Sequence, residues 1–180
     1  MNKFGKKAGK GVIAVTYPDE FYKKEFIGLA NAAGLMVTRV VTQKYLGNKY
    51  GVGAGKAEEI KQIAEETHSE GIIVDEHLTS SQAYNLSKLT GQNVIDRERL
   101  ILDIFSKRAT TAEGKLQVQL AELKYAMPRV KEEINRSLSG ERPGFSGMGA
   151  SAVDVRFRDM RRQMSFIQKR LLQVAKQRSL

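Results

Sequence analysis

The chain has 180 residues, which is room for one ordinary domain or for a small domain with an appended helical piece. Hydrophobic residues make up 41% of it, enough for a packed core, and the lack of cysteine excludes disulfides, thiolate metal sites and cysteine nucleophiles. The net charge is +10 and no apolar run is long enough to span a bilayer, so we expect a cytoplasmic protein with a polyanionic partner.

The first half of the chain alternates short apolar runs with helical patterns. The apolar runs predict strands at residues 11–17, 35–41, 71–74 and 93–95. Between them the pattern predicts helices at residues 19–33, 56–69 and 79–89, the first capped by Asp19 and ended by Gly34. Strands that alternate with helices need crossover connections, so residues 1–96 are predicted to form a small α/β domain with a parallel sheet.

From Asp96 onward the pattern is helical. Two sets of apolar residues recur at steps of four and three, which places each set on one stripe of a helix, as in the seam of a coiled-coil pair. The sets are Leu116, Leu120, Leu123, Met127, Val130 and Ile134, then Val153, Phe157, Met160, Met164, Ile167, Leu171 and Val174. Between them, residues 139–151 are too rich in glycine and proline to continue a helix. Residues 97–180 are therefore predicted to form an antiparallel two-helix hairpin with a Gly-rich tip loop at 139–151.

The excess positive charge lies in the second half of the chain. Residues 1–96 hold 12 Lys or Arg against 11 Asp or Glu, whereas residues 97–180 hold 18 against 9. Much of this positive charge lies at one outward heptad position of the last predicted helix and at the residues beside that position. A solvated helix face is the alternative, but a stripe of one sign is the expected footprint of a contact with a phosphate backbone. We predict that a polyanion, with RNA, DNA and an anionic membrane as the candidates, contacts the stripe residues Arg158, Arg161, Arg162, Lys169, Arg170 and Lys176.

The tip loop carries Arg142, Phe145 and Met148 among glycines. Glycine lets a backbone approach closely, arginine can pair with phosphate, and phenylalanine can stack on an unpaired base. From these residues alone, an RNA-probing loop and a disordered linker are equally open.

A Gly-rich segment before the second predicted helix resembles a P-loop, which needs Gly-x-x-x-x-Gly-Lys-Ser/Thr. Counting back from Gly55 puts Tyr50 at the first glycine position, and Ala57 replaces the hydroxyl that would hold magnesium. A weaker phosphate contact at Gly53, Gly55 and Lys56 stays open, because the free N–H groups at a helix start favour an anion. A nucleotide-binding enzyme that uses this Gly53–Lys56 loop is accordingly the alternative to a binding module.

Other polar residues do not combine into a catalytic or metal site. The two histidines, His68 and His77, lack metal-ligand spacing. Asp75 and Glu76 end a strand where α/β enzymes often place acids, but without a nucleophile beside them we favour capping and surface roles. For Asp96 and Arg97 we favour ion pairs that orient the two parts of the chain. We predict no catalytic residue and no metal site.

The segment from Val94 to Val130 closely resembles the N-terminal signature of HflX GTPases. Gly53–Ile60 is similar to the Gly-x-Gly-Lys segment of that family, and Asp75–Gln82 to its third strand and the following turn. The likeness covers residues 11–178. It departs from the family at Ala150, which stands where an acid is expected.

The resemblance implies an α/β domain, a long helical hairpin and a GTPase domain after it. It also implies binding to the large ribosomal subunit, with the hairpin loop directed at the RNA of the peptidyl-transferase centre. With this resemblance we predict that the stripe residues and the loop residues Arg142, Phe145 and Met148 bind RNA, the loop becoming ordered on binding. The sequence up to Leu180 holds none of the GTPase motifs, so we expect this chain alone not to hydrolyse GTP and to need no cofactor, with GTP and magnesium belonging to the GTPase domain. The expected partners are the large subunit and its RNA, not a membrane. We expect a monomer; a coiled-coil oligomerisation arm is the alternative.

Overall fold

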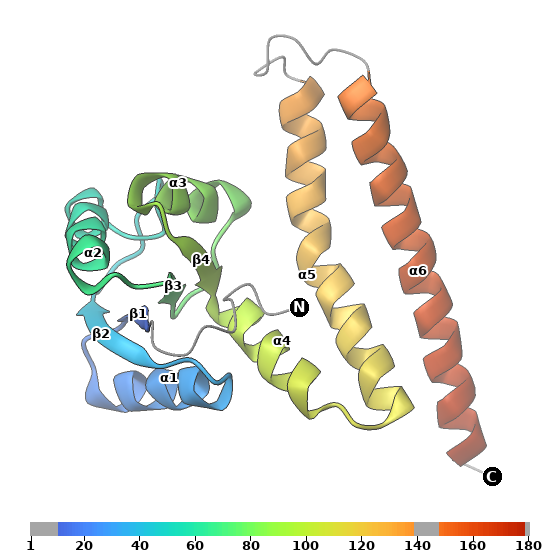
Figure 1. The fold of residues 1–180 in the computed structure, drawn as a ribbon. Helices are drawn as coiled ribbons and strands as arrows, with labels where there is room; N and C mark the ends of the chain where they lie inside the picture. The colour runs from blue at the N-terminus through green and yellow to red at the C-terminus, as the bar shows by residue number, and fades with distance from the viewer. Residues whose placement is uncertain (1–10, 139–147, 179–180) are drawn as a thin grey trace. The chain divides into compact units, whose positions relative to one another are not determined.

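The computed structural model describes residues 11–138 and 148–178, and the chain divides into two units, Met1–Lys107 and Arg108–Leu180 (Figure 1). The first unit contains β1 (Val12–Thr16), α1 (Glu20–Ala32), β2 (Val37–Thr42), α2 (Ala54–Thr67), β3 (Gly71–Val74), α3 (Ser80–Thr90), β4 (Asn93–Asp96) and α4 (Arg97–Arg108). The second contains α5 (Ala112–Leu138) and α6 (Met148–Arg178). The predicted α/β class and the predicted helical hairpin are confirmed.

The four strands form one parallel sheet in the order β2-β1-β3-β4. Alternate residues of β1 point to opposite faces, and both faces are covered by helices, so every residue of β1 is buried. Val12 and Ala14 contribute to a core with α1 and α4, while Ile13 and Val15 contribute to a core with α2 and α3. This double covering explains why the two central strands, β1 and β3, read as short continuous apolar runs and not as alternating ones.

Local signals in the sequence set the start of α1 and both ends of α3. Asp19 accepts hydrogen bonds from the backbone N–H groups of Phe21, at 2.8 Å, and of Tyr22, at 3.3 Å, as the predicted N-cap of α1. Thr79 and Gln82 form a capping box at the start of α3. Gly91 ends α3 with φ at +68°, a conformation that glycine adopts without strain.

The boundary between the two units differs from the predicted one between Asp96 and Arg97. α4 lies on the sheet, because Leu100 and Ile104 are buried in the same core as α1. The chain then leaves the helical conformation after Arg108, and the Thr111 hydroxyl accepts a hydrogen bond from the N–H of Gly114 at 3.0 Å. Helical periodicity continues across this break, and for that reason it did not separate α4 from the hairpin.

The second unit is a pair of antiparallel helices (Figure 1). The predicted seam is confirmed in α6, where Met160 and Ile167 are buried and the other five members are partly buried. In α5, Val130 is buried and the four earlier members of the set are partly buried. α6 begins at Met148, so the end of the predicted tip loop, residues 148–151, is helical. Among the described residues, no helix has both the length and the apolar character that crossing a membrane requires.

Candidate nucleic-acid interface

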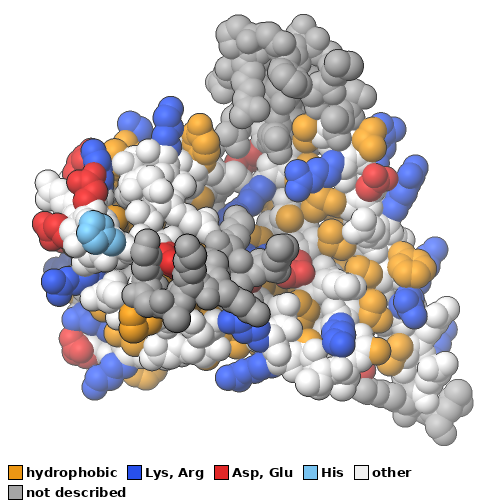
Figure 2. Space-filling view, in the orientation of Figure 1, with side chains coloured by type: hydrophobic (Ala, Val, Ile, Leu, Met, Phe, Trp, Pro, Cys, Tyr) orange, Lys and Arg blue, Asp and Glu red, His pale blue; other side chains and the backbone are white. Residues whose placement is uncertain are grey.

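The outer face of α6 carries the predicted basic stripe. Burial of the seam against α5 turns the opposite side of the helix toward solvent. All six predicted cations of this helix are exposed, and Figure 2 shows Lys and Arg side chains spread over the surface of the hairpin. The periodicity of the seam therefore decides where the charge lies.

Few of these cations are neutralised by neighbouring acids. Arg162 lies 3.6 Å from Asp159, and both side chains are largely exposed, so the pair contributes about 0–1 kcal/mol and can exchange for another anion. Arg158 donates a long hydrogen bond of 3.4 Å to the carbonyl of Asp154, one turn earlier. In the described part of the chain, Lys169 and Lys176 take part in no ion pair. The stripe thus presents positive charge that is available to a partner.

The same face carries an aromatic residue that the sequence analysis missed. Phe166 is 60% exposed, and the guanidinium carbon of Arg170 lies 5.7 Å from the centre of its ring. The signal was present, because the heptad count that places Arg162 and Lys169 outward also places Phe166 between them.

The structure does not test the predicted RNA-binding residues of the tip loop. Arg142 and Phe145 lie outside the described residues. Met148 is the first residue of α6, and nothing is described of its side chain. Their role in RNA binding stays a prediction.

The α/β unit has a second cluster of charged groups, at the carboxyl ends of β1 and β3. The chain leaves β1 for β2 on one side and reaches β3 on the other, and such a switch point is where open α/β sheets bind ligands. Here the Thr16 hydroxyl donates to Asp75 at 2.6 Å, and Arg97 donates to the other oxygen of Asp75 at 2.5 Å. Arg97 also donates to both carboxylate oxygens of Glu25, at 2.9 and 2.6 Å.

This cluster is satisfied by its own members. The hydrogen bonds to Glu25, with those to Asp75, raise the pKa of Arg97 above its ordinary value and outweigh the opposing effect of burial. Asp75 is buried, and both its oxygens accept hydrogen bonds, so its carboxylate has a structural role. Glu25 and Asp75 both belong to the first unit, whereas the sequence analysis expected Arg97 to orient the two parts of the chain.

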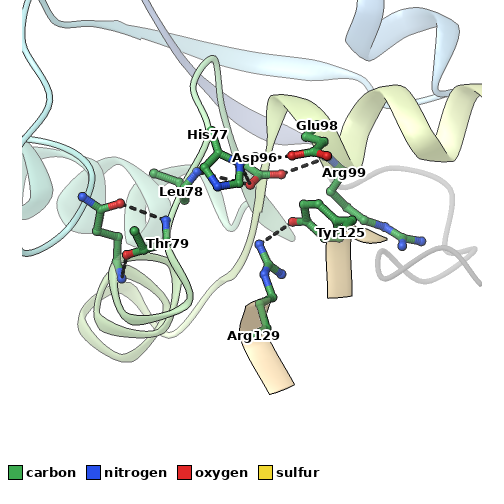
Figure 3. A network of polar contacts seen from close by, with 9 residues as sticks. His77, Leu78, Thr79, Asp96, Glu98, Arg99, Tyr125 and Arg129 are labelled. Carbon is green, nitrogen blue, oxygen red and sulfur yellow. Dashed lines mark hydrogen bonds and ion pairs between the residues drawn. The ribbon is translucent and has the colours of Figure 1, made fainter. Parts of the chain in front are cut away.

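Asp96 has a comparable structural role at the start of α4 (Figure 3). Its fully buried carboxylate accepts hydrogen bonds from the backbone N–H groups of Leu78, at 3.2 Å, and Arg99, at 2.9 Å. It therefore ties the loop after β3 to the first turn of α4. The exposed His77 lies beside it, with Nδ1 3.1 Å from a carboxylate oxygen of Glu98.

The candidate phosphate loop lies before α2, where Gly53 is the N-cap and provides no side-chain hydrogen bond. The N–H groups of the first turn therefore remain open to an anion. However, the ammonium group of Lys56, which would contact a phosphate there, lies 2.6 Å from a carboxylate oxygen of Glu59. Gly53 and Gly55 are exposed, with open space where a Cβ would stand. Within this loop, the glycines whose Cβ would clash are Gly47 and Gly51, neither of which belongs to the nucleotide motif.

Known proteins share both units of the chain. Residues 20–106 match the family model described as GTP-binding GTPase N-terminal, and residues 108–180 match that of the GTP-binding GTPase Middle Region. GTPase HflX of Thermococcus kodakarensis is 39% identical over 171 residues, which are 94% of this chain and 39% of that protein. GTPase HflX of Escherichia coli K12 is 39% identical over 160 residues, which are 86% of this chain and 37% of that protein.

The chain belongs to the HflX family. Within HflX it corresponds to the N-terminal region, and it spans about two fifths of the length of these curated relatives. The family-model boundary, between residues 106 and 108, agrees with the division between the two units of the structure.

Solved structures share the fold. A GTP-binding protein from Sulfolobus solfataricus, in complex with GDP, has a TM-score of 0.65 at 25% identity, covering 92% of this chain and 46% of that one. A structure described as an SsGBP and GDP complex has a TM-score of 0.71 at 24% identity, covering 96% of this chain and 47% of that one, and shows the fold alone. The HflX chain thus has the architecture of N-terminal regions in GTP-binding proteins.

Proposed function

We propose that this HflX region is a ribosome-binding module that docks on RNA of the large ribosomal subunit through the outer face of α6. The observation that best supports this proposal is that the seam residues of α6 are buried or partly buried, whereas the six cations of the stripe are all exposed. The family resemblance supplies the large subunit as the partner.

The electrostatics support RNA over a protein partner. Residues 134–180 hold 10 Lys or Arg against three Asp or Glu, so positive charge is in large excess over this stretch. Polyanions release counterions when cations neutralise their phosphates, which rewards such a surface. Interfaces between proteins are instead depleted of charge at their centres.

The α/β unit supports binding more than catalysis. The acids at its switch point are held in hydrogen bonds with Thr16 and Arg97, and the cation of the Gly-rich loop is paired with Glu59. We propose accordingly that this chain alone does not hydrolyse GTP.

The test is co-sedimentation with purified large subunits over a range of salt concentrations. Replacing Arg158, Arg162 and Lys169 together by Gln removes three stripe charges, and the slope of log affinity against log salt should become shallower by about 2–3. Binding in low salt should weaken as well.

A matched control removes the same charge from the α/β unit, with Lys24, Arg39 and Lys44 replaced by Gln; all three side chains are exposed. It changes net charge equally, so it reports on unspecific attraction. If both triple variants change the salt slope equally, the stripe is not the contact.

The alternative, nucleotide binding at the Gly53–Lys56 loop, predicts heat of ATP or GTP binding that Lys56→Ala abolishes. We expect calorimetry to detect no Lys56-dependent binding, because Tyr50 stands at the first glycine position of the phosphate motif and Ala57 replaces its hydroxyl.

A further inference from the structure

Phe166 is a large apolar side chain in the middle of a cationic surface. It lies on the side of α6 away from the buried Ile167 and the partly buried Met164, and 60% of it is exposed. It therefore contributes little to the seam. In Figure 2, hydrophobic side chains of the hairpin lie between Lys and Arg side chains.

Three of the four residues that neighbour Phe166 on the helix surface are cations, and the fourth is Gln163. Arg162 stands four residues before it, and Lys169 and Arg170 stand three and four residues after it. Residues at these spacings are neighbours on a helix surface. The Arg170 guanidinium lies over the ring, 5.7 Å from its centre, which is within the range of a cation–π contact.

An aromatic ring among cations matches the chemistry of a nucleotide that is not paired. The ring offers a face on which any base can stack, and the cations can pair with the phosphates on either side. In a duplex the bases are already stacked on one another, so only the phosphates would remain available. A second copy of this helix face is disfavoured as the partner, because the cations of the two copies would repel one another.

We propose that Phe166 stacks on an unpaired base of the bound RNA, while Arg162, Lys169 and Arg170 hold the adjoining phosphates. This inference rests on the proposed function, and it names the ligand as single-stranded RNA at this point of the arm. Arg162 can take part because its pair with Asp159 is exposed to solvent at both ends.

The experiment measures binding of the full chain to a single-stranded oligouridylate and to an RNA duplex of equal length. Phe166→Ala should weaken binding to the single strand about tenfold, since a base–aromatic stack contributes on the order of 1–3 kcal/mol, and should leave duplex binding unchanged. The control is Leu172→Ala on the same helix, because Leu172 is 63% exposed and should change neither affinity.

A second variant gives a direct readout. The chain contains no tryptophan, so Phe166→Trp introduces a single fluorophore and preserves an aromatic face. The oligouridylate should quench the tryptophan emission of this variant. The variant should bind the oligouridylate at least as tightly as the parent chain does. A Phe166→Ala variant that behaves like Leu172→Ala, or a Phe166→Trp variant whose emission ignores the oligouridylate, overturns the proposal.

The outcomes separate this inference from the proposed function. If the triple Gln variant loses large-subunit binding while Phe166→Ala binds the oligouridylate normally, the phosphate contact stands and the base contact is wrong. If the triple variant keeps its binding and salt slope, both fail.

Discussion

At the scale of single residues, glycines that look alike in the sequence have different physical roles. Gly51 has φ at +71°, and a Cβ there would stand 2.2 Å from Cδ2 of Leu78, whose displacement would disturb the packed core around it. Gly53 has an ordinary extended conformation and open space around it. The loop therefore needs glycine for its fit against Leu78, at a position that the phosphate motif does not include.

This contrast predicts the effect of two alanine substitutions. Gly51→Ala combines an unfavourable φ with overpacking, so we expect it to lower the free energy of unfolding by about 2 kcal/mol or more. Gly53→Ala should change it by less than about 0.5 kcal/mol. Urea denaturation followed by circular dichroism measures both. Equal effects would show that the loop conformation is not set by the contact with Leu78.

At the scale of elements, α6 is a helix with two distinct faces. Ile167 is 6% exposed in the seam, whereas Leu172 is 63% exposed, although both are aliphatic and lie on one continuous helix. The seam holds the hairpin together, and an exposed side chain such as Leu172 contributes little to that packing. Stability and binding should therefore respond to different substitutions.

Ile167→Ala should destabilise the hairpin by about 2–4 kcal/mol, because it removes buried methyl groups and leaves a cavity between the helices. Leu172→Ala should cost less than about 0.5 kcal/mol. Thermal unfolding of both variants, compared with the parent chain, tests this. A similar loss for the two would mean that the seam is not the packed face.

At the scale of the whole molecule, the important boundary is the one after α4. Leu100 is fully buried and Ile104 is 7% exposed, both in the core with α1. Lys107, at the end of α4, donates a hydrogen bond to the carbonyl of Ala33 at the end of α1. α4 is thus part of the α/β unit, in agreement with the family-model boundary.

A fragment of residues 1–107 should fold cooperatively, whereas a fragment of residues 1–96 should not. Loss of α4 removes Leu100 and Ile104 from the core with α1 and uncovers part of one face of the sheet. Each buried aliphatic side chain contributes about 1.5–3 kcal/mol, a large part of the stability of a small domain. Amide dispersion in NMR spectra and the cooperativity of thermal unfolding distinguish the two. Should residues 1–96 melt as sharply as residues 1–107, α4 is not needed by this core.

Much of the fold was predictable because its signals are local. Asp19 and Gly91 act at helix ends through groups a few residues away, and the heptad spacing of the last helix identifies its seam and its basic stripe. The break before α5 was missed because the one local signal, Thr111 as a cap, lies inside a continuous helical pattern. Phe166 was missed because the stripe was defined by its charged residues alone, and an aromatic residue carries no charge.

The sequence by itself determined the strands, the start of α1 and the outward position of the cations, because each depends on spacing along a few turns or on one capping side chain. Only the tertiary structure decided that Arg97 joins Asp75 and Glu25, which are 22 and 72 residues away from it. The parallel sheet brings the carboxyl ends of β1 and β3 together at one edge, and no local pattern encodes which charges meet there. The same packing assigned α4 to the sheet, since burial of Leu100 depends on the helix beside it and not on its own periodicity.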